Sequence, residues 1–284
     1  ASNCKVEENS IHRDEAFTVN SSVKWSNAKI ENKKASDVFL EKPINVAFLS
    51  TYPPRECGVA TFTQDLVLQM AKFQATRRIK IIAISNEKIN YDENVIMELE
   101  QNDRSSYLQI AKKLNNSAIE LLVIEHEYGI YGGDSGEYLL DITDNLNIPF
   151  VTTLHTVLPE PTEKQWYILN ALGRKSKKII TMAKNTVDIL VNIYGIEASK
   201  IEVINHGVPF IPIKSRESLK AEMGVENRSI VSTFGLLGPG KGLEYGIEAI
   251  AKVAKNHKDV LYYILGQTHP VIKKELGEVY RESL

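Results

Sequence analysis

The residues best suited to binding a phosphate lie in STFGLLGPGKGLEYGIEAIAKV, residues 232–253. An apolar run ends in a glycine-rich loop with Lys241, and apolar residues with helical spacing follow it. A lysine beside a helix N-terminus suits a diphosphate, because the ammonium and the free N–H groups both attract negative charge. We predict that Lys241, Gly238 and Gly240 contact a diphosphate. A solvated lysine in a strand-to-helix turn is the alternative.

This loop departs from two familiar nucleotide-binding patterns. It lacks the G-x-x-x-x-G-K-[ST] spacing of a P-loop. The dinucleotide pattern G-x-G-x-x-G occurs neither in this loop nor after the first apolar run. ATPase and dehydrogenase activities are therefore disfavoured.

A second candidate loop, TYPPRECGVATFTQDL, follows the apolar run INVAFLS at residues 44–50. Gly58 would open a helix there, and its free N–H groups would favour an anion, so Gly58 is a second predicted diphosphate contact. Arg55 and Glu56 lie beside it and are predicted to contact sugar hydroxyls. A tight turn that needs glycine only for its geometry remains an equal alternative.

A third loop begins with EHEYGIYGG at residues 125–133. We predict a catalytic role for His126, and contacts of Glu127 and Gly132 with an acceptor or sugar, because clustered glycines let backbone approach a ligand closely. The His-Glu pair lacks the second histidine of a helical zinc site, so no metal is expected. A structural histidine at a strand end is the competing interpretation.

His155 follows another apolar run, IPFVTTLH, at residues 148–155. Its imidazole is able to donate a hydrogen bond to a substrate hydroxyl or to a developing charge, so we predict a catalytic role. His126 and His155 both end runs of the same kind, and they would converge in one cleft if the two strands were neighbours. A purely structural role for His155 remains open.

These loops need a scaffold that brings strand ends together, and the apolar pattern supplies one. Short continuous apolar runs alternate with helical patterns from residue 44 to residue 205, which is typical of parallel strands buried on both faces. Right-handed crossovers then predict a doubly wound, Rossmann-like sheet of the α/β class. The alternation resumes at residue 229, but two strands and one helix make an incomplete second Rossmann-like domain.

The predicted organisation has four parts. They are a polar N-terminal extension (1–42), a Rossmann-like domain (43–207), a linker (208–228) and a partial second domain (229–284).

Length and composition agree with this organisation. The 284 residues are 43% hydrophobic, which is ordinary for a globular protein. The net charge of −2 argues against nucleic-acid binding. Two cysteines are too few for a disulfide framework, and no apolar run approaches the roughly 18 residues of a membrane helix, which together favour a cytoplasmic protein.

Taken together, the motifs resemble the GT-B glycosyltransferases, and within them the retaining, mannosyltransferase-like members of family 4. The matching segments run in the family's order from about residue 44 onward, and they are PPRECGVATFTQDL, IEHEYGIYGG, TLHTVLPEP, KIEVINHGVP, TFGLLGPGKGLEYGIEAIAKV and YYILGQTHP. The resemblance implies an acceptor-side N-terminal domain and a C-terminal domain that binds a nucleotide-sugar. It implies transfer of a sugar, with mannose one candidate, from a GDP- or UDP-linked donor to a glycan or lipid-linked acceptor, with retention.

The resemblance also implies roles for three residues, and the sequence departs from the family's motifs at two points. Lys241 matches the family's lysine on the donor diphosphate, Gly58 its glycine loop, and His155 the loop that contacts the transferred sugar. Leu236 stands where many members carry arginine, and the Glu-x7-Glu motif would fall beyond Leu284.

Two alternatives and two further expectations accompany the resemblance. A truncated, non-catalytic module that binds sugar or nucleotide is the main alternative, and a phosphorylase of similar build is a weaker one. Contact with the inner face of a membrane is compatible with such an enzyme, and no cofactor beyond the nucleotide-sugar co-substrate is expected.

Overall fold

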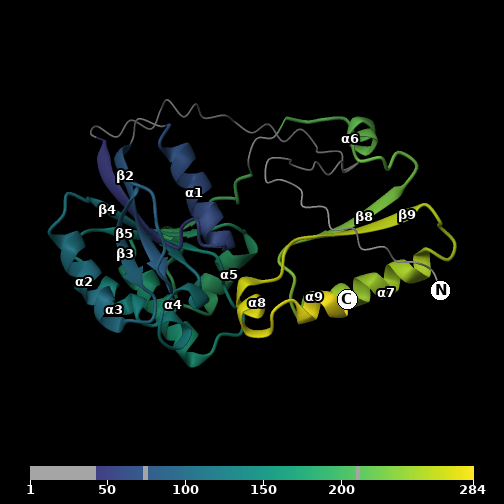
Figure 1. The fold of residues 1–284 in the computed structure, drawn as a ribbon. Helices are drawn as coiled ribbons and strands as arrows, with labels where there is room; N and C mark the ends of the chain where they lie inside the picture. Colours follow the sequence, from purple (N-terminus) through teal and green to yellow (C-terminus); the bar gives the residue numbers. More distant parts are fainter. Residues whose placement is uncertain (1–42, 73–75, 209–211) are drawn as a thin grey trace. The chain divides into compact units, whose positions relative to one another are not determined.

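The computed structural model describes residues 43–72, 76–208 and 212–284 (Figure 1). The extension predicted over residues 1–42 lies outside the described residues. The chain divides into two compact units, one within Lys29–Pro209 and another containing Phe210–Leu284. Their described parts are called the large unit (43–208) and the small unit (212–284).

A seven-stranded parallel sheet forms the centre of the large unit, with strand order β3-β2-β1-β4-β5-β6-β7. Successive strands are added outward in both directions from β1 and β4, as in a doubly wound sheet. This confirms the predicted α/β Rossmann-like class. The strands are β1 (Ile44–Ser50), β2 (Thr76–Ser85), β3 (Val95–Glu100), β4 (Leu121–His126), β5 (Phe150–Leu154), β6 (Ile179–Thr181) and β7 (Ile201–Val203).

Helices cover both faces of this sheet. The α-helices of the large unit are α1 (Gly58–Met70), α2 (Arg104–Asn115), α3 (Leu139–Asn145), α4 (Glu163–Lys175) and α5 (Asn185–Asn192). Short 3-10 turns add η2 (Tyr128–Ile130), η3 (Asp134–Gly136) and η4 (Ala198–Lys200).

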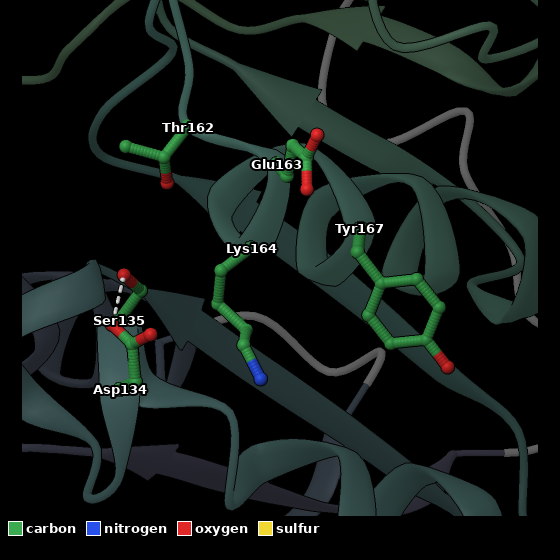
Figure 2. Close-up of a pocket in the computed structure, with 6 residues that line it drawn as sticks. All are labelled: Asp134, Ser135, Thr162, Glu163, Lys164 and Tyr167. Atoms are coloured by element: carbon green, nitrogen blue, oxygen red, sulfur yellow. Dashed lines mark hydrogen bonds between the residues drawn. The ribbon is translucent and has the colours of Figure 1, made fainter.

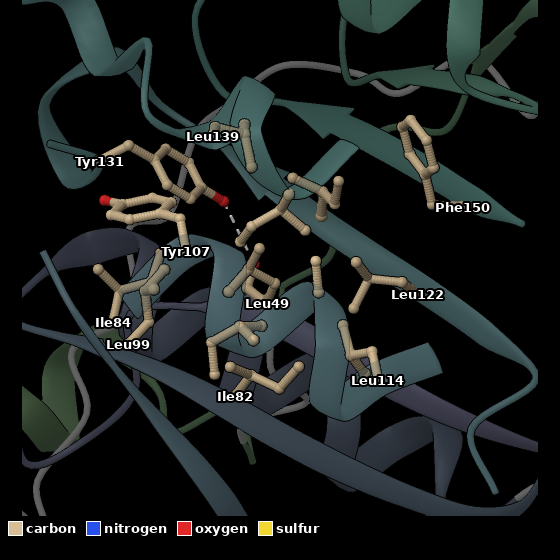
Figure 3. Close-up of a cluster of buried hydrophobic side chains, with 14 of the residues drawn as sticks. Leu49, Ile82, Ile84, Leu99, Tyr107, Leu114, Leu122, Tyr131, Leu139 and Phe150 are labelled. Atoms are coloured by element: carbon tan, nitrogen blue, oxygen red, sulfur yellow. Dashed lines mark hydrogen bonds between the residues drawn. The ribbon is translucent and has the colours of Figure 1, made fainter. Parts of the chain in front are cut away.

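Alternate residues of β1 supply two hydrophobic cores. Ala47 and Leu49 face the cluster that includes α2, α3 and α4, whereas Val46 and Phe48 face the cluster that includes α1 (Figures 1 and 3). Each fully buried side chain of leucine or phenylalanine size contributes about 1.5–3 kcal/mol to stability. Because both faces are buried, the strand reads as a continuous apolar run in the sequence.

One strand and one α-helix of the large unit were not predicted. Strand β3, at the sheet edge, alternates partly buried and exposed residues along most of its length, so it has no continuous apolar run. Helix α3 has only seven residues, which is too short for a clear helical period.

The small unit contains a two-stranded parallel sheet of β8 (Ser229–Phe234) and β9 (Val260–Leu265), joined through α7 (Leu243–Val253). Both strands and the helix agree with the sequence pattern. The segment 208–228, expected to be a linker, contains helix α6 (Arg216–Glu222), which begins at a Ser215 side-chain cap. Two further short helices are α8 (Pro270–Leu276) and α9 (Val279–Ser283).

Candidate functional site

The order of strands places a candidate site at the carboxyl ends of β1, β4 and β5. Strand order reverses between β1 and β4, and ligands of doubly wound sheets bind in the crevice outside such a reversal. Strand β5 pairs with β4 so that His126 lies opposite Leu154, and the His155 N–H donates to the His126 carbonyl at 3.0 Å. The two predicted histidines therefore do end neighbouring strands.

His155 is held by a buried carboxyl group. Its Nε2 lies 2.9 Å from Oε2 of Glu125, whose side chain is 0% exposed while that of His155 is 12% exposed. Burial raises the pKa of Glu125, and the hydrogen bond to His155 opposes that rise. The ring of Phe62, from α1, packs edge-on against His155 with centroids 4.8 Å apart. His155 thus has a fixed ring that retains some access to solvent.

His126 has a different environment, although it is adjacent to Glu125 in the chain. It is 1% exposed, and burial lowers its pKa to about 3 with a smaller contribution from His155. Its ring contacts Tyr128 edge-on and stacks on Tyr131. The ring is therefore neutral and enclosed, and its Nδ1 has no hydrogen-bond partner among the described residues. This burial favours the structural interpretation, whereas the catalytic role of His126 stays a prediction.

The start of α1 forms another wall at the end of β1. Cys57 precedes the helix without a side-chain cap, and a Cβ built on Gly58 would meet nothing within 4 Å. The space over this helix start is therefore open, and its N–H groups are free of a side-chain cap. Phe62, one turn further, also contacts the exposed His206 with centroids 5.1 Å apart.

Arg55 and Glu56 differ in their surroundings. The guanidinium of Arg55 donates to the Ile84 carbonyl and to Gln101 Oε1, both at 3.1 Å, so it ties the loop after β1 to the ends of β2 and β3. That engagement makes Arg55 a support of the loop. The side chain of Glu56 is exposed at the same rim.

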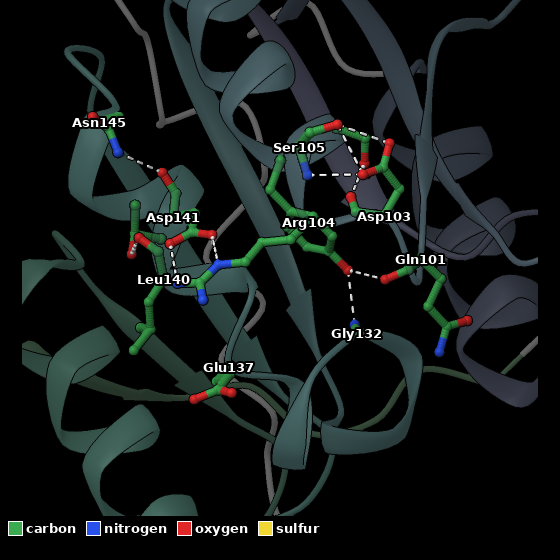
Figure 4. A network of polar contacts seen from close by, with 12 residues as sticks. Gln101, Asp103, Arg104, Ser105, Gly132, Glu137, Leu140, Asp141 and Asn145 are labelled. Carbon is green, nitrogen blue, oxygen red and sulfur yellow. Dashed lines mark hydrogen bonds and ion pairs between the residues drawn. The ribbon is translucent and has the colours of Figure 1, made fainter.

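Gly132 packs where the loop after β4 meets the loop after β3. A Cβ on Gly132 would lie 2.0 Å from the Gln101 carbonyl oxygen, and its N–H donates to Tyr107 Oη at 2.8 Å (Figure 4). Tyr107 in turn donates to the same Gln101 carbonyl. Glycine is therefore required here by the fold, which explains the residue without a sugar contact.

Glu127 also has protein partners. Its carboxylate accepts the Tyr128 N–H at 2.9 Å, capping η2, and accepts the Thr156 hydroxyl. It thereby joins the loop after β4 to the loop after β5, which carries His155.

An open pocket of about 610 Å³ lies between η3 and the start of α4 (Figure 2). Thr162 begins α4 with a reciprocal capping box to Gln165. Ser135 has a positive φ of 56°, an uncommon conformation for a residue other than glycine. The lining residues are Asp134, Ser135, Thr162, Glu163, Lys164 and Tyr167, which offer carboxylates, hydroxyls and one exposed aromatic ring.

The predicted diphosphate loop lies in the small unit. Lys241 is exposed, and Gly242 precedes α7 in a left-handed conformation with no side-chain cap. Gly240 has φ 83°, so the turn itself favours glycine there. Gly238 is buried, and a Cβ built on it would make only ordinary contacts with Ile272 and His269. The described structure is therefore compatible with an anion at this helix start.

Sequence reasoning missed Glu125 and Phe62. Glu125 lies at the end of the apolar run IELLVIEH, but the run also contains Glu120, so a glutamate in the run does not by itself indicate a site residue. Phe62 follows the helical spacing of buried α1 residues, so nothing in the pattern separates it from the core.

The described residues also bear on metal ligation and on membrane crossing. Among them, no group of three or more His, Cys, Asp or Glu side chains is placed to hold a metal ion. None of the described helices combines the length and apolar character that crossing a bilayer requires.

Residues 102–210 match the family model described as Glycosyltransferase Family 4. This segment contains Glu125, His126, Glu127, Gly132 and His155, and it ends before the small unit. No curated protein matches the chain at a significant level.

Solved structures share the fold at low sequence identity. HepE (Alr3699) of Anabaena, in complex with UDP, matches with a TM-score of 0.58 and 16% identity over 84% of this chain and 65% of that chain. A glycosyltransferase from Rickettsia africae ESF-5 matches with TM-score 0.57 and 20% identity over 84% and 64% of the two chains. MnaA of S. aureus, also in complex with UDP, matches with TM-score 0.52 and 14% identity over 82% and 66%. The present chain thus spans about 65% of the length of HepE.

Proposed function

We propose that the protein is a glycosyltransferase that moves a hexosyl group from a nucleotide-sugar to a hydroxyl of a glycan or lipid-linked acceptor. The observation that carries the proposal is the family 4 match over residues 102–210. This segment contains His155 and Glu125, which contact each other at the carboxyl ends of the strands. The GT-B-like fold is consistent with it.

The donor we propose is a UDP-linked sugar, with GDP-linked sugars, including GDP-mannose, as the second class to test. HepE has been solved with UDP-glucose, and MnaA with UDP. In the present chain, Lys241 and the uncapped start of α7 are the proposed contacts of the donor diphosphate. In the large unit, the open helix start at Gly58 is proposed separately as a phosphate contact.

The proposed chemistry breaks the bond between the anomeric carbon and the donor diphosphate and forms one to the acceptor oxygen. The acceptor proton passes to the departing diphosphate, and attack on the same face retains the configuration. The residues of this chain would position both substrates and stabilise the leaving charge. The pocket between η3 and α4 offers Asp134, Glu163 and Tyr167 to acceptor hydroxyls and to a sugar face.

Turnover of nucleotide-sugars tests this proposal. The purified chain is incubated with UDP- and GDP-sugars, and release of nucleoside diphosphate is followed with and without candidate acceptors. We expect release for one nucleotide class and, in His155→Ala, a fall in kcat of about a hundredfold. Absence of both turnover and calorimetric binding for every nucleotide-sugar would overturn the proposal.

Lys241 tests the donor site separately. We expect Lys241→Ala to weaken nucleoside diphosphate binding about tenfold or more, because a charge-assisted contact is lost. Lys255→Ala, which removes another exposed lysine of the small unit, is the matched control. Equal affinities for the two variants would show that Lys241 is not a diphosphate contact.

A further inference from the structure

The carboxyl group of Glu125 is the most deeply buried acidic group at the candidate site. Its side chain is 0% exposed, and only one of its two oxygens has a hydrogen-bond partner within the described structure. Oε2 meets His155 Nε2 at 2.9 Å, whereas Oε1 has no partner, although the Thr153 hydroxyl is close enough to oppose the rise in pKa. A bare carboxylate oxygen in such a place is costly, and the carbonyl oxygen of a neutral carboxyl costs much less.

Burial therefore favours a pair with no net charge. Glu125 and His155 reach that state when they hold two protons together, one within the Oε2–Nε2 hydrogen bond and one on the ring. The neighbouring His126 stays neutral and supplies no compensating charge. Wherever the shared proton lies in the hydrogen bond, the second proton is on Nδ1 of His155.

Neighbouring groups hold the His155 ring with Nε2 toward Glu125. The Glu125 carbonyl accepts the Tyr131 hydroxyl at 2.8 Å, and the His155 N–H is bound to the end of β4. Phe62 covers the ring edge-on. Titratable groups described nearby include His126, Tyr131 and Glu127 on the β4 side, and His206 on the far side of Phe62.

We propose that Glu125 is a positioning residue that keeps a proton on His155 Nδ1, so that this nitrogen donates a hydrogen bond to the bound sugar. No protein partner for Nδ1 is seen among the described residues, and the side chain retains 12% exposure. The role as sugar donor contact rests on the proposed glycosyltransferase function, whereas the protonation of Nδ1 is a property of the unliganded protein.

Nitrogen NMR of the imidazole rings tests the protonation directly and needs no substrate. In the whole chain at neutral pH we expect Nδ1 of His155 to carry a proton, with the signal assigned by its loss in His155→Ala. The same state should persist in Glu125→Gln, because the glutamine amide N–H can replace the carboxyl as donor to Nε2. It should also persist in the control variant Asp141→Asn, because the wild-type Asp141 carboxylate pairs with Arg104 and not with His155. An unprotonated Nδ1 in the wild-type protein would overturn the proposal.

Kinetics test the consequence for catalysis. Glu125→Met keeps a similar volume but removes the hydrogen bond, so we expect kcat to fall roughly ten- to a hundredfold with little change in KM. Glu125→Gln should retain kcat within about threefold. Full activity in the methionine variant, or equal loss in both variants, would overturn the proposal.

The two readouts separate failure of this inference from failure of the proposed function. If the methionine variant does not fold, the NMR comparison of the wild-type protein with Glu125→Gln still decides. If no nucleotide-sugar is turned over but Nδ1 is protonated as expected, the proposed function fails while the assignment of Glu125 to the His155 ring stands.

Discussion

At the residue scale, two adjacent residues of strand β4 have side chains in different surroundings. Glu125 and His126 end β4, and successive side chains of a strand point to opposite faces. Glu125 meets the partly exposed His155, whereas His126 is enclosed by tyrosines from the following loop. Of these two neighbouring residues, Glu125 is therefore the one that contacts the partly exposed His155, whereas His126 is buried among tyrosines.

The lowered pKa of His126 predicts a specific loss of stability in acid. Its folded pKa, about 3, lies below the ordinary value of 6.5, so the unfolded chain binds the proton first as the pH falls. Stability from this group is present above about pH 6.5 and declines toward pH 3, by at most about 1.4 kcal/mol per pH unit.

Urea unfolding at pH 7.5 and 5.5 measures this effect. We expect the wild-type protein to lose about 1 kcal/mol more than His126→Phe between these values, because the variant has no imidazole to protonate. The raised pKa of Glu125 acts in the opposite direction but is present in both proteins. Identical losses in the two proteins would contradict the assignment.

At the element scale, the loops after β3 and β4 are joined by close backbone packing. Gly132 leaves no room for a side chain against the Gln101 carbonyl, and Tyr107 bridges the two through its hydroxyl. Nearby, Arg104 and Asp141 tie α2 to α3 through two hydrogen bonds of 2.7 and 3.0 Å (Figure 4). This packing positions the loop that follows the buried glutamate.

Gly132→Ala should therefore destabilise the large unit by about 2 kcal/mol or more, since its Cβ must displace backbone. Gly129→Ala, three residues earlier in the same loop, is the matched control because its Cβ would meet nothing within 4 Å. We expect the control to lie within about 0.5 kcal/mol of the wild type. Thermal or urea unfolding of both variants measures the difference, and equal stabilities would refute the packing argument.

At the scale of the whole molecule, the two units differ in how well their strands are buried. Strand β4 has five buried residues of six, whereas all six residues of β9 are only partly buried. In β8, Phe234 is 87% exposed. Backbone amides of the small unit therefore depend on fewer buried contacts.

Hydrogen exchange should show this difference in the isolated chain. We expect amides of β8 and β9 to exchange with opening free energies at least about 2 kcal/mol lower than those of β1 and β4, because poorly buried strands open locally. Residue-resolved exchange by mass spectrometry or NMR provides the measurement. Equal protection of the two sheets would show that burial does not set local stability here.

The sequence by itself predicted most strands of the two sheets and the loops at their carboxyl ends that form the candidate site. Continuous apolar runs predicted β1, β2 and β4 to β9, and the residues after them predicted the candidate loops, because burial on both faces leaves a local pattern. Pairing and side-chain direction depend on contacts between distant segments, which no local pattern records. The tertiary structure alone therefore decided that Glu125 meets His155 thirty residues away, that His126 is enclosed, and that Gly132 is required by Gln101.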